Sequence, residues 1–151
     1  MVFTVYLPAA GGNCCVEDGK RIKRIHPIRE IYIKSENEIK IYCWTGVVFE
    51  YPKENLRFFR DSSEAEAYVR GEIPWQSWKE EELGFRVKLP ASSGEYCVKK
   101  SFGMASIYRV TAYWLISEHH IKIQCENESY LDYPSDQLTF FEDYESAKAN
   151  C

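Results

Sequence analysis

The sequence predicts an α+β protein that is mostly β and contains two copies of one small unit. Residues 1–69 align with residues 83–151 without a gap, at a constant displacement of 82 positions. Apolar and polar residues alternate over several short segments of each copy, as in half-buried strands. Each copy then ends in a segment with helix-start signals. We expect an antiparallel meander or a partly open barrel with a short C-terminal helix in each copy, and a pseudo-two-fold axis between the copies.

Identical residues carry the repeat along its whole length. The motif Tyr-Pro-x-x-x-Leu-x-Phe-Phe occurs at residues 51–59 and again at residues 133–141. The domains predicted are therefore a first copy over 1–69 and a second copy over 83–151, with a linker over 70–82. A unit of this size has little core of its own, so we expect the two copies to pack as one globular unit.

The strands of the first copy follow from alternation and turn residues. Phe3, Val5 and Leu7 predict a strand that Pro8 ends, and a second short strand is expected around Cys15. A three-stranded antiparallel meander is predicted next. Its inward-facing residues are expected to be Ile31, Ile33, Ile39, Ile41, Cys43, Phe49 and Tyr51. Residues 56–59 then give either a last strand or an extended edge, because Pro52 precedes them.

Helix-start signals close each copy. Ser63 and Glu66 have the spacing of a capping box, which predicts a helix that runs to Val69. The second copy repeats the pattern from Asp143 to the end of the chain. In the linker, Trp75 and Trp78 are three residues apart, and we expect both rings to dock on the protein.

The six cysteines allow three interpretations. Cys15 and Cys43 recur as Cys97 and Cys125, all at apolar positions of strands, where free cysteine behaves as a small hydrophobic residue. A disulfide within each copy and a four-cysteine metal site on the pseudo-dyad are the alternatives. No Cys-x-x-Cys pair occurs, so we predict no metal site and no cofactor. The two cysteines without a counterpart, Cys14 and Cys151, are candidates for exposed thiols.

The net charge and the composition of the chain argue against general binding to nucleic acid or to membranes. The formal net charge of −4 gives no general attraction to polyanions, so binding to nucleic acid or to a membrane would have to rest on a local patch. We expect no membrane partner, because no apolar stretch approaches the length of a span. The amino terminus lacks the pattern of a signal peptide, which favours a cytoplasmic protein.

The copies differ most on the outer face of the first meander and in one loop. Tyr32, Tyr42 and Trp44 share the face opposite the core residues, and their aromatic character favours a partner-binding surface. The alternative is that the outer faces of the two copies pack together. A basic run adds the other candidate binding residues, Lys20, Arg21, Lys23 and Arg24, which the second copy replaces with Phe-Gly-Met-Ala-Ser over 102–106. The alternative there is a solvated loop.

Histidines and catalytic motifs favour a non-enzymatic protein. His119 and His120 are expected at an exposed hairpin turn, and His26 is given no role. No phosphate-binding loop, zinc-protease motif or nucleophile elbow occurs, although a site built from dispersed residues would leave no local pattern.

We therefore predict a protein-binding module, such as an adaptor, an inhibitor or an immunity-like protein, with a protein partner that the sequence does not identify. Single-stranded nucleic-acid binding, with bases stacked on the three aromatic residues, is the alternative. A small ligand carrier or enzyme with its site between the copies is the third hypothesis.

Overall fold

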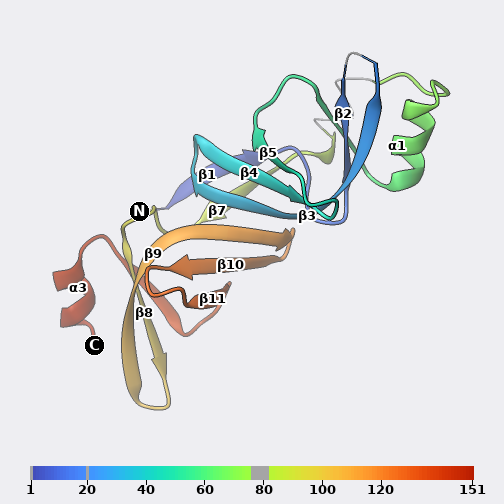
Figure 1. Ribbon diagram of the computed structural model, residues 1–151. Coiled ribbons are helices and arrows are strands. Elements are labelled where there is room, and N and C mark those ends of the chain that lie inside the picture. Colours follow the sequence, from blue (N-terminus) through green and yellow to red (C-terminus); the bar gives the residue numbers. More distant parts are fainter. Residues whose placement is uncertain (1, 20, 76–81) are drawn as a thin grey trace.

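The computed structural model describes residues 2–19, 21–75 and 82–151 (Figure 1). Over these residues the protein is mostly β, with antiparallel strand pairs and the two short helices α1 (Ser62–Val69) and α3 (Tyr144–Ala149), which confirms the mostly β part of the predicted fold class. The described strands do not close into a barrel. None of the described helices is long and apolar enough to cross a membrane.

One continuous sheet forms the centre of the molecule. Its two longest strands are β3 (Lys23–Ser35) and β9 (Met104–Ser117), which pair antiparallel through Ile31–Leu115, Tyr32–Trp114 and Ile33–Tyr113. On the far side of β3 lie β4 (Glu38–Cys43) and β5 (Val48–Tyr51), and on the far side of β9 lie β10 (His120–Cys125) and β11 (Tyr130–Tyr133). Two meanders thus join edge to edge, as Figure 1 shows.

Both long strands continue beyond the central sheet into a second set of pairs. The first part of β3 pairs with β2 (Cys14–Asp18), which also pairs with β6 (Leu56–Phe59). The first part of β9 pairs with β8 (Tyr96–Ser101), which also pairs with β12 (Leu138–Phe141). A separate two-stranded sheet joins β1 (Phe3–Leu7) to β7 (Phe85–Leu89).

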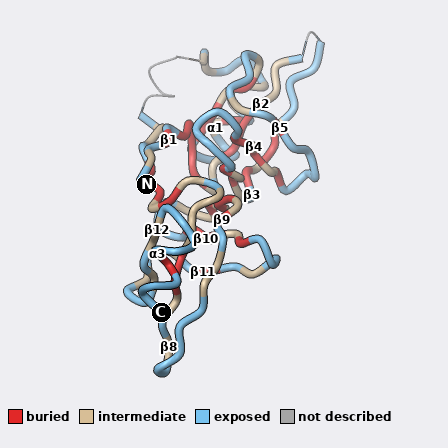
Figure 2. The backbone as a smooth tube through the Cα atoms, turned by 90° about the vertical axis from the view of Figure 1, so that its left-hand side faces the viewer, coloured by how far each residue is buried: buried red, intermediate tan, exposed pale blue. Residues whose placement is uncertain are grey.

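The core is shared between the two halves of the chain. The meander residues predicted to face inward are buried, except Tyr51, which is half-buried. They form one cluster with residues of the second half, including Tyr113, Leu115 and Ile123. Buried stretches accordingly lie in the middle of the molecule and exposed hairpin tips at its ends (Figure 2). A smaller cluster lies beneath the first helix, where Trp75 packs at its edge; Trp78 lies outside the described residues.

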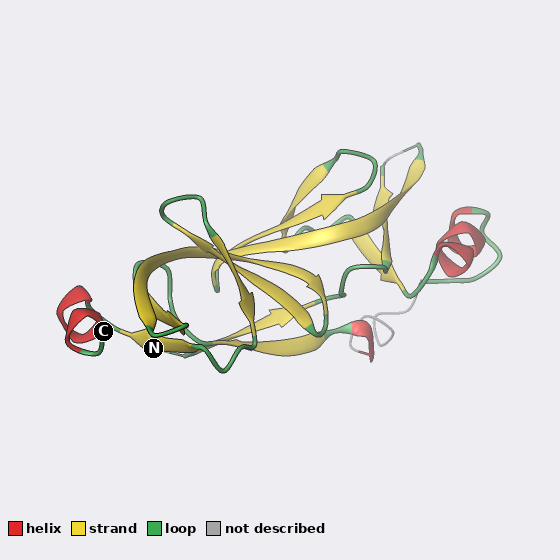
Figure 3. Cartoon of the chain, turned by 90° about the horizontal axis from the view of Figure 1, so that it is seen from below, coloured by secondary structure: helices red, strands yellow, loops and turns green. Residues whose placement is uncertain are grey.

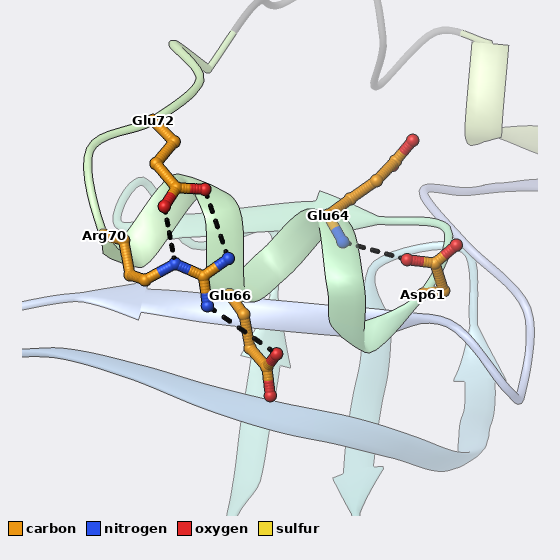
Figure 4. Close-up of polar contacts among 5 residues, drawn as sticks. All are labelled: Asp61, Glu64, Glu66, Arg70 and Glu72. Carbon is orange, nitrogen blue, oxygen red and sulfur yellow. Dashed lines mark hydrogen bonds and ion pairs between the residues drawn. The ribbon is translucent and has the colours of Figure 1, made fainter.

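The helices α1 (Ser62–Val69) and α3 (Tyr144–Ala149) lie at opposite ends of the protein (Figure 3). The capping box predicted at Ser63 and Glu66 is wrong. Asp61 is the N-cap, and its Oδ1 accepts a hydrogen bond from the backbone N–H of Glu64 at 2.9 Å (Figure 4). An aspartate accepts this bond as well as a serine does, and it adds a negative charge at the helix N-terminus. Asp143 caps α3 in the same way, at 2.7 Å from Ser146 N.

Candidate functional site

An aromatic cluster crosses the seam between β3 and β9 on the outer face of the central sheet. The Trp114 ring lies 4.9 Å from that of Tyr32 and 5.0 Å from that of Tyr42, between centroids. Its Nε1 donates to Gln124 Oε1 at 2.8 Å, so all three rings are held in place. Tyr32 and Tyr42 are half-buried here. For these two residues, the outer faces of the two halves do pack on each other, as the structural alternative predicted.

Trp44 is the aromatic residue of this face that remains exposed to solvent. It directly follows β4 and is 69% exposed, although its backbone N–H donates to Pro27 O at 2.9 Å. The Arg29 guanidinium lies 5.8 Å from the Trp44 ring and 6.0 Å from the Tyr42 ring. Val47 and Val48, on the other arm of the same hairpin, are exposed as well. Trp44 is thus a supported aromatic side chain at the edge of the cluster, with apolar neighbours on its own hairpin.

The basic run lies away from this face. Arg21, Lys23 and Arg24 belong to the tip of the β2–β3 hairpin, and Lys20 lies outside the described residues. Tyr32 is nine positions after Lys23 on β3, which corresponds to roughly 30 Å along an extended strand, whereas the backbone N–H of Trp44 bonds to Pro27, three positions from Arg24. The structure therefore separates the basic run from Tyr32 but leaves Trp44 closer to it.

Two carboxylates lie opposite basic residues near the tip of the β2–β3 hairpin. In the β2–β3 ladder, Arg24 pairs with Glu17 and Lys23 pairs with Asp18. The Lys23 Nζ also lies 4.3 Å from the centroid of the Tyr68 ring on α1. Both carboxylates also pair with other cations, Glu17 with Lys53 at 3.7 Å and Asp18 with Arg57 at 3.6 Å, so they lower the positive field that a phosphate backbone would meet only in part.

Sequence reasoning gave His26 no role, but the structure buries it beneath the Trp44 hairpin. Its exposure is 5%, its Nδ1 lies 2.7 Å from Thr45 Oγ1, and its ring packs edge-on against Phe49 at 5.1 Å. Glu17 Oε1 is 3.8 Å from Nε2. Burial lowers the pKa of His26, and the nearby Glu17 only partly opposes this. A neutral His26 therefore links the turn that carries Trp44 to strand β3.

His26 should make the stability of the protein depend on pH. Because its pKa is lower in the folded state, its contribution to stability is complete above the pKa of an exposed histidine, about 6.5, and is lost as the pH falls through the folded-state pKa. We expect the free energy of unfolding, measured by urea titration, to fall as the pH is lowered below about 6.5. His26→Gln should remove this part of the drop, and the exposed His120→Gln should not. An unchanged pH dependence in His26→Gln would contradict the assignment.

A shallow cavity of about 290 Å³ lies beside the seam, where the third hypothesis placed a ligand site. Tyr32, Lys34, Arg109, Gln124 and Glu126 are among its lining residues. Its two cations already have carboxylate partners, because Arg109 is 3.8 Å from Glu126 and Lys34 is 3.8 Å from Glu38. This cavity has room for a small polar molecule, but it assembles no nucleophile with a base.

The cysteines behave as small hydrophobic residues. All six are free thiols, so the predicted alternative of a disulfide within each copy is not what the structure has. Burial raises the pKa of Cys97 to about 12 and that of Cys125 to about 11, and both thiols stay protonated at neutral pH. Cys14 is buried, contrary to expectation, whereas Cys151 is exposed. Within the described ranges, no group of three or more His, Cys, Asp or Glu residues is placed to hold a metal ion.

Arg29 is the site residue that sequence reasoning missed. It lies at an irregularity of register between Ile28 and Glu30, where β3 gains one residue relative to β4. Strict alternation does not predict the face of a residue at a bulge. The signal available in the sequence was only that the alternation fails between Ile28 and Ile31.

Comparisons with known proteins give no relative for this chain. No protein-family model matches it. No curated protein matches it either, and neither does any solved structure.

Proposed function

We propose that this protein is a non-enzymatic protein-binding module and that Trp44 anchors its partner. The observation that carries the proposal is that a large aromatic side chain stays 69% exposed while its turn is fastened to β3. Exposed aromatics that are already held in position lose little conformational entropy on binding, and such residues dominate interface energetics. The partner would present an apolar socket to Trp44, Val47 and Val48.

We also propose that the two halves arose as copies of one unit related by a pseudo-two-fold axis. The strand registers support this. Tyr32 faces Trp114 at the centre of the β3–β9 pairing, and Val5 faces Val87 at the centre of the β1–β7 pairing. Both pairs join positions 82 residues apart, the displacement of the sequence repeat. On this proposal, Trp44 belongs to the first copy alone, because the aligned position in the second copy is Glu126.

The binding proposal is tested by capture of partners from the source cells. We expect the wild-type protein to retain a protein in stoichiometric amount, and Trp44→Ala to bind it at least about tenfold more weakly. Tyr130→Ala is the matched control, because Tyr130 is also an exposed aromatic on the outer face, at 54% exposure. Circular dichroism would verify that both variants fold. Equal capture by all three proteins would remove Trp44 from the site.

Single-stranded nucleic-acid binding remains the alternative proposal. It requires bases on the aromatic face and phosphates on the basic tip, yet Lys23 and Arg24 face carboxylates in their own hairpin. The discriminating measurement is a titration with an oligonucleotide at low salt, where electrostatic binding is strongest. Micromolar affinity that is lost in Arg21→Gln and Arg24→Gln would favour this alternative over the protein-binding proposal.

A further inference from the structure

The tip of the β8–β9 hairpin exposes apolar side chains that the proposed function does not use. Phe102 is fully exposed and Met104 is 73% exposed. Ser101 and Met104 are the last residues that pair, so Phe102 and Gly103 form a two-residue turn between the strands. Figures 1 and 2 both show this hairpin projecting from the body of the protein, at the opposite end from the β2–β3 hairpin. Among the described residues, none covers the side chain of Phe102.

Phe102 is also an unfavourable residue for the turn that it occupies. Its φ is 53° and that of Gly103 is 76°, and a two-residue hairpin turn with both φ values positive favours Asn or Gly at its first position. A bulky side chain rarely adopts this backbone conformation. The hairpin would be more stable with Asn at position 102, and Phe102 contributes nothing to the core. Phe102 at the tip therefore indicates contact with another molecule rather than a role in stabilising the fold.

Within the β8–β9 hairpin itself the charges have one sign, although β12, which pairs with β8, follows the acidic Asp136. Lys99 and Lys100 lie on β8 just before the turn, paired with Ser106 and Ala105. No acidic residue occurs from Tyr96 to Val110, although the whole chain carries 23 acidic residues and a net charge of −4. The hairpin is thus a basic region on an acidic protein, and its exposed apolar side chains lie at the turn, beyond the two lysines.

We propose that the β8–β9 tip inserts into the interface of a membrane that contains anionic lipids. Phe102 and Met104 enter the boundary between head groups and acyl chains, and Lys99 and Lys100 contact lipid phosphates. The order of the groups along the hairpin, apolar at the point and basic behind it, matches the order of layers in such an interface. An apolar pocket on a partner protein could also bind Phe102 and Met104. Such a pocket would give no reason for the two lysines that precede the turn. Because the whole protein has a net negative charge, binding to anionic lipids requires a local basic patch, and Lys99 and Lys100 supply one at this tip.

The test is flotation of the full-length protein with phosphatidylcholine vesicles, with and without phosphatidylserine. We expect the wild-type protein to float with the vesicles that contain phosphatidylserine, and Phe102→Asn to bind them at least about tenfold more weakly. Because Asn suits positive φ, this variant should unfold at the same or a higher temperature than the wild-type protein. A loss of binding would then not be a loss of folding. Lys99→Gln with Lys100→Gln should reduce the dependence on phosphatidylserine.

The opposite hairpin tip supplies the matched control. Ile22 is 59% exposed and follows Arg21 at the β2–β3 tip, so Ile22→Asn changes a similar side chain at the other end of the molecule. Ile22→Asn and Trp44→Ala should both float as the wild-type protein does, which separates this proposal from the protein-binding proposal. The proposal is overturned if the wild-type protein does not bind the anionic vesicles, if Phe102→Asn binds them unchanged, or if Ile22→Asn loses binding equally. Phe102-dependent capture of a protein without vesicle binding would instead indicate a protein socket.

Discussion

Replacing Tyr113 with Phe should lower the free energy of unfolding by about 2–4 kcal/mol, although the change removes one oxygen atom. Tyr113 has no exposed surface, and its hydroxyl makes two hydrogen bonds to Ala91, which is equally buried. The hydroxyl donates to Ala91 O at 2.5 Å and accepts from Ala91 N at 3.1 Å. Burial raises the pKa of Tyr113, so the hydroxyl keeps the proton that it donates. The Tyr113→Phe variant would leave two buried backbone groups without this partner.

Urea denaturation of the two proteins measures this effect directly. Tyr130→Phe is the control, because Tyr130 is 54% exposed and its hydroxyl can bond to water in either state. We expect that variant to unfold within about 0.5 kcal/mol of the wild-type protein. If Tyr113→Phe lowered the free energy of unfolding by no more than Tyr130→Phe, the backbone groups of Ala91 would have found other hydrogen-bond partners. The Tyr113–Ala91 hydrogen bonds would then contribute little to holding β9 against the segment after β7.

The strands of this protein are largely predictable from sequence, whereas the pairing between its halves is not. Alternation places Ile31, Ile33 and Ile41 on the buried face, as the structure has them. A period of two specifies which face of a strand is buried, but not which strand lies at its edge. The pairing of β3 with β9 brings together segments about 80 residues apart, and no local sequence pattern predicts this pairing. The same holds for β1 and β7.

The candidate site was predictable only where it depends on strand faces. Tyr32, Tyr42 and Trp114 share the outer face that alternation assigns to them, and the seam then brings them into contact. Exposure was not predictable, because the covering of Tyr42 by Trp114 depends on the seam, whereas Trp44 lies in the turn after β4 and stays exposed. Most of β3 separates the basic run from Tyr32, whereas Trp44 is bonded near the start of this strand, and the sequence alone predicts neither placement.

A second large effect should come from Gly11→Ala, which we expect to destabilise the protein by about 2–4 kcal/mol. A Cβ built at Gly11 would lie 2.0 Å from Ile116 O and 3.1 Å from Arg29 O. Both are backbone atoms, of β9 and of β3, so a side-chain rotation cannot relieve the clash. Position 11 therefore requires glycine because two strands of the seam approach it closely. The aligned residue in the second half is Ser93, which lies beside the cavity and has room for its side chain.

Gly12→Ala separates this close approach from an ordinary glycine effect. Gly12 has φ +94° and no heavy atom within 4 Å of the built Cβ, so alanine there costs only the backbone strain, about 1 kcal/mol. Gly11→Ala alone should also displace β9 from β3 and so change the edge-to-face contact between Trp114 and Tyr32, which near-ultraviolet circular dichroism would detect. Equal losses of stability in the two variants, with unchanged aromatic signals, would show that the seam tolerates a side chain at Gly11. Tyr42, two residues before Trp44, contacts Trp114 across the same seam. A variant that opens the seam without unfolding the protein should therefore displace Tyr42, while leaving the vesicle binding assigned to Phe102 unchanged.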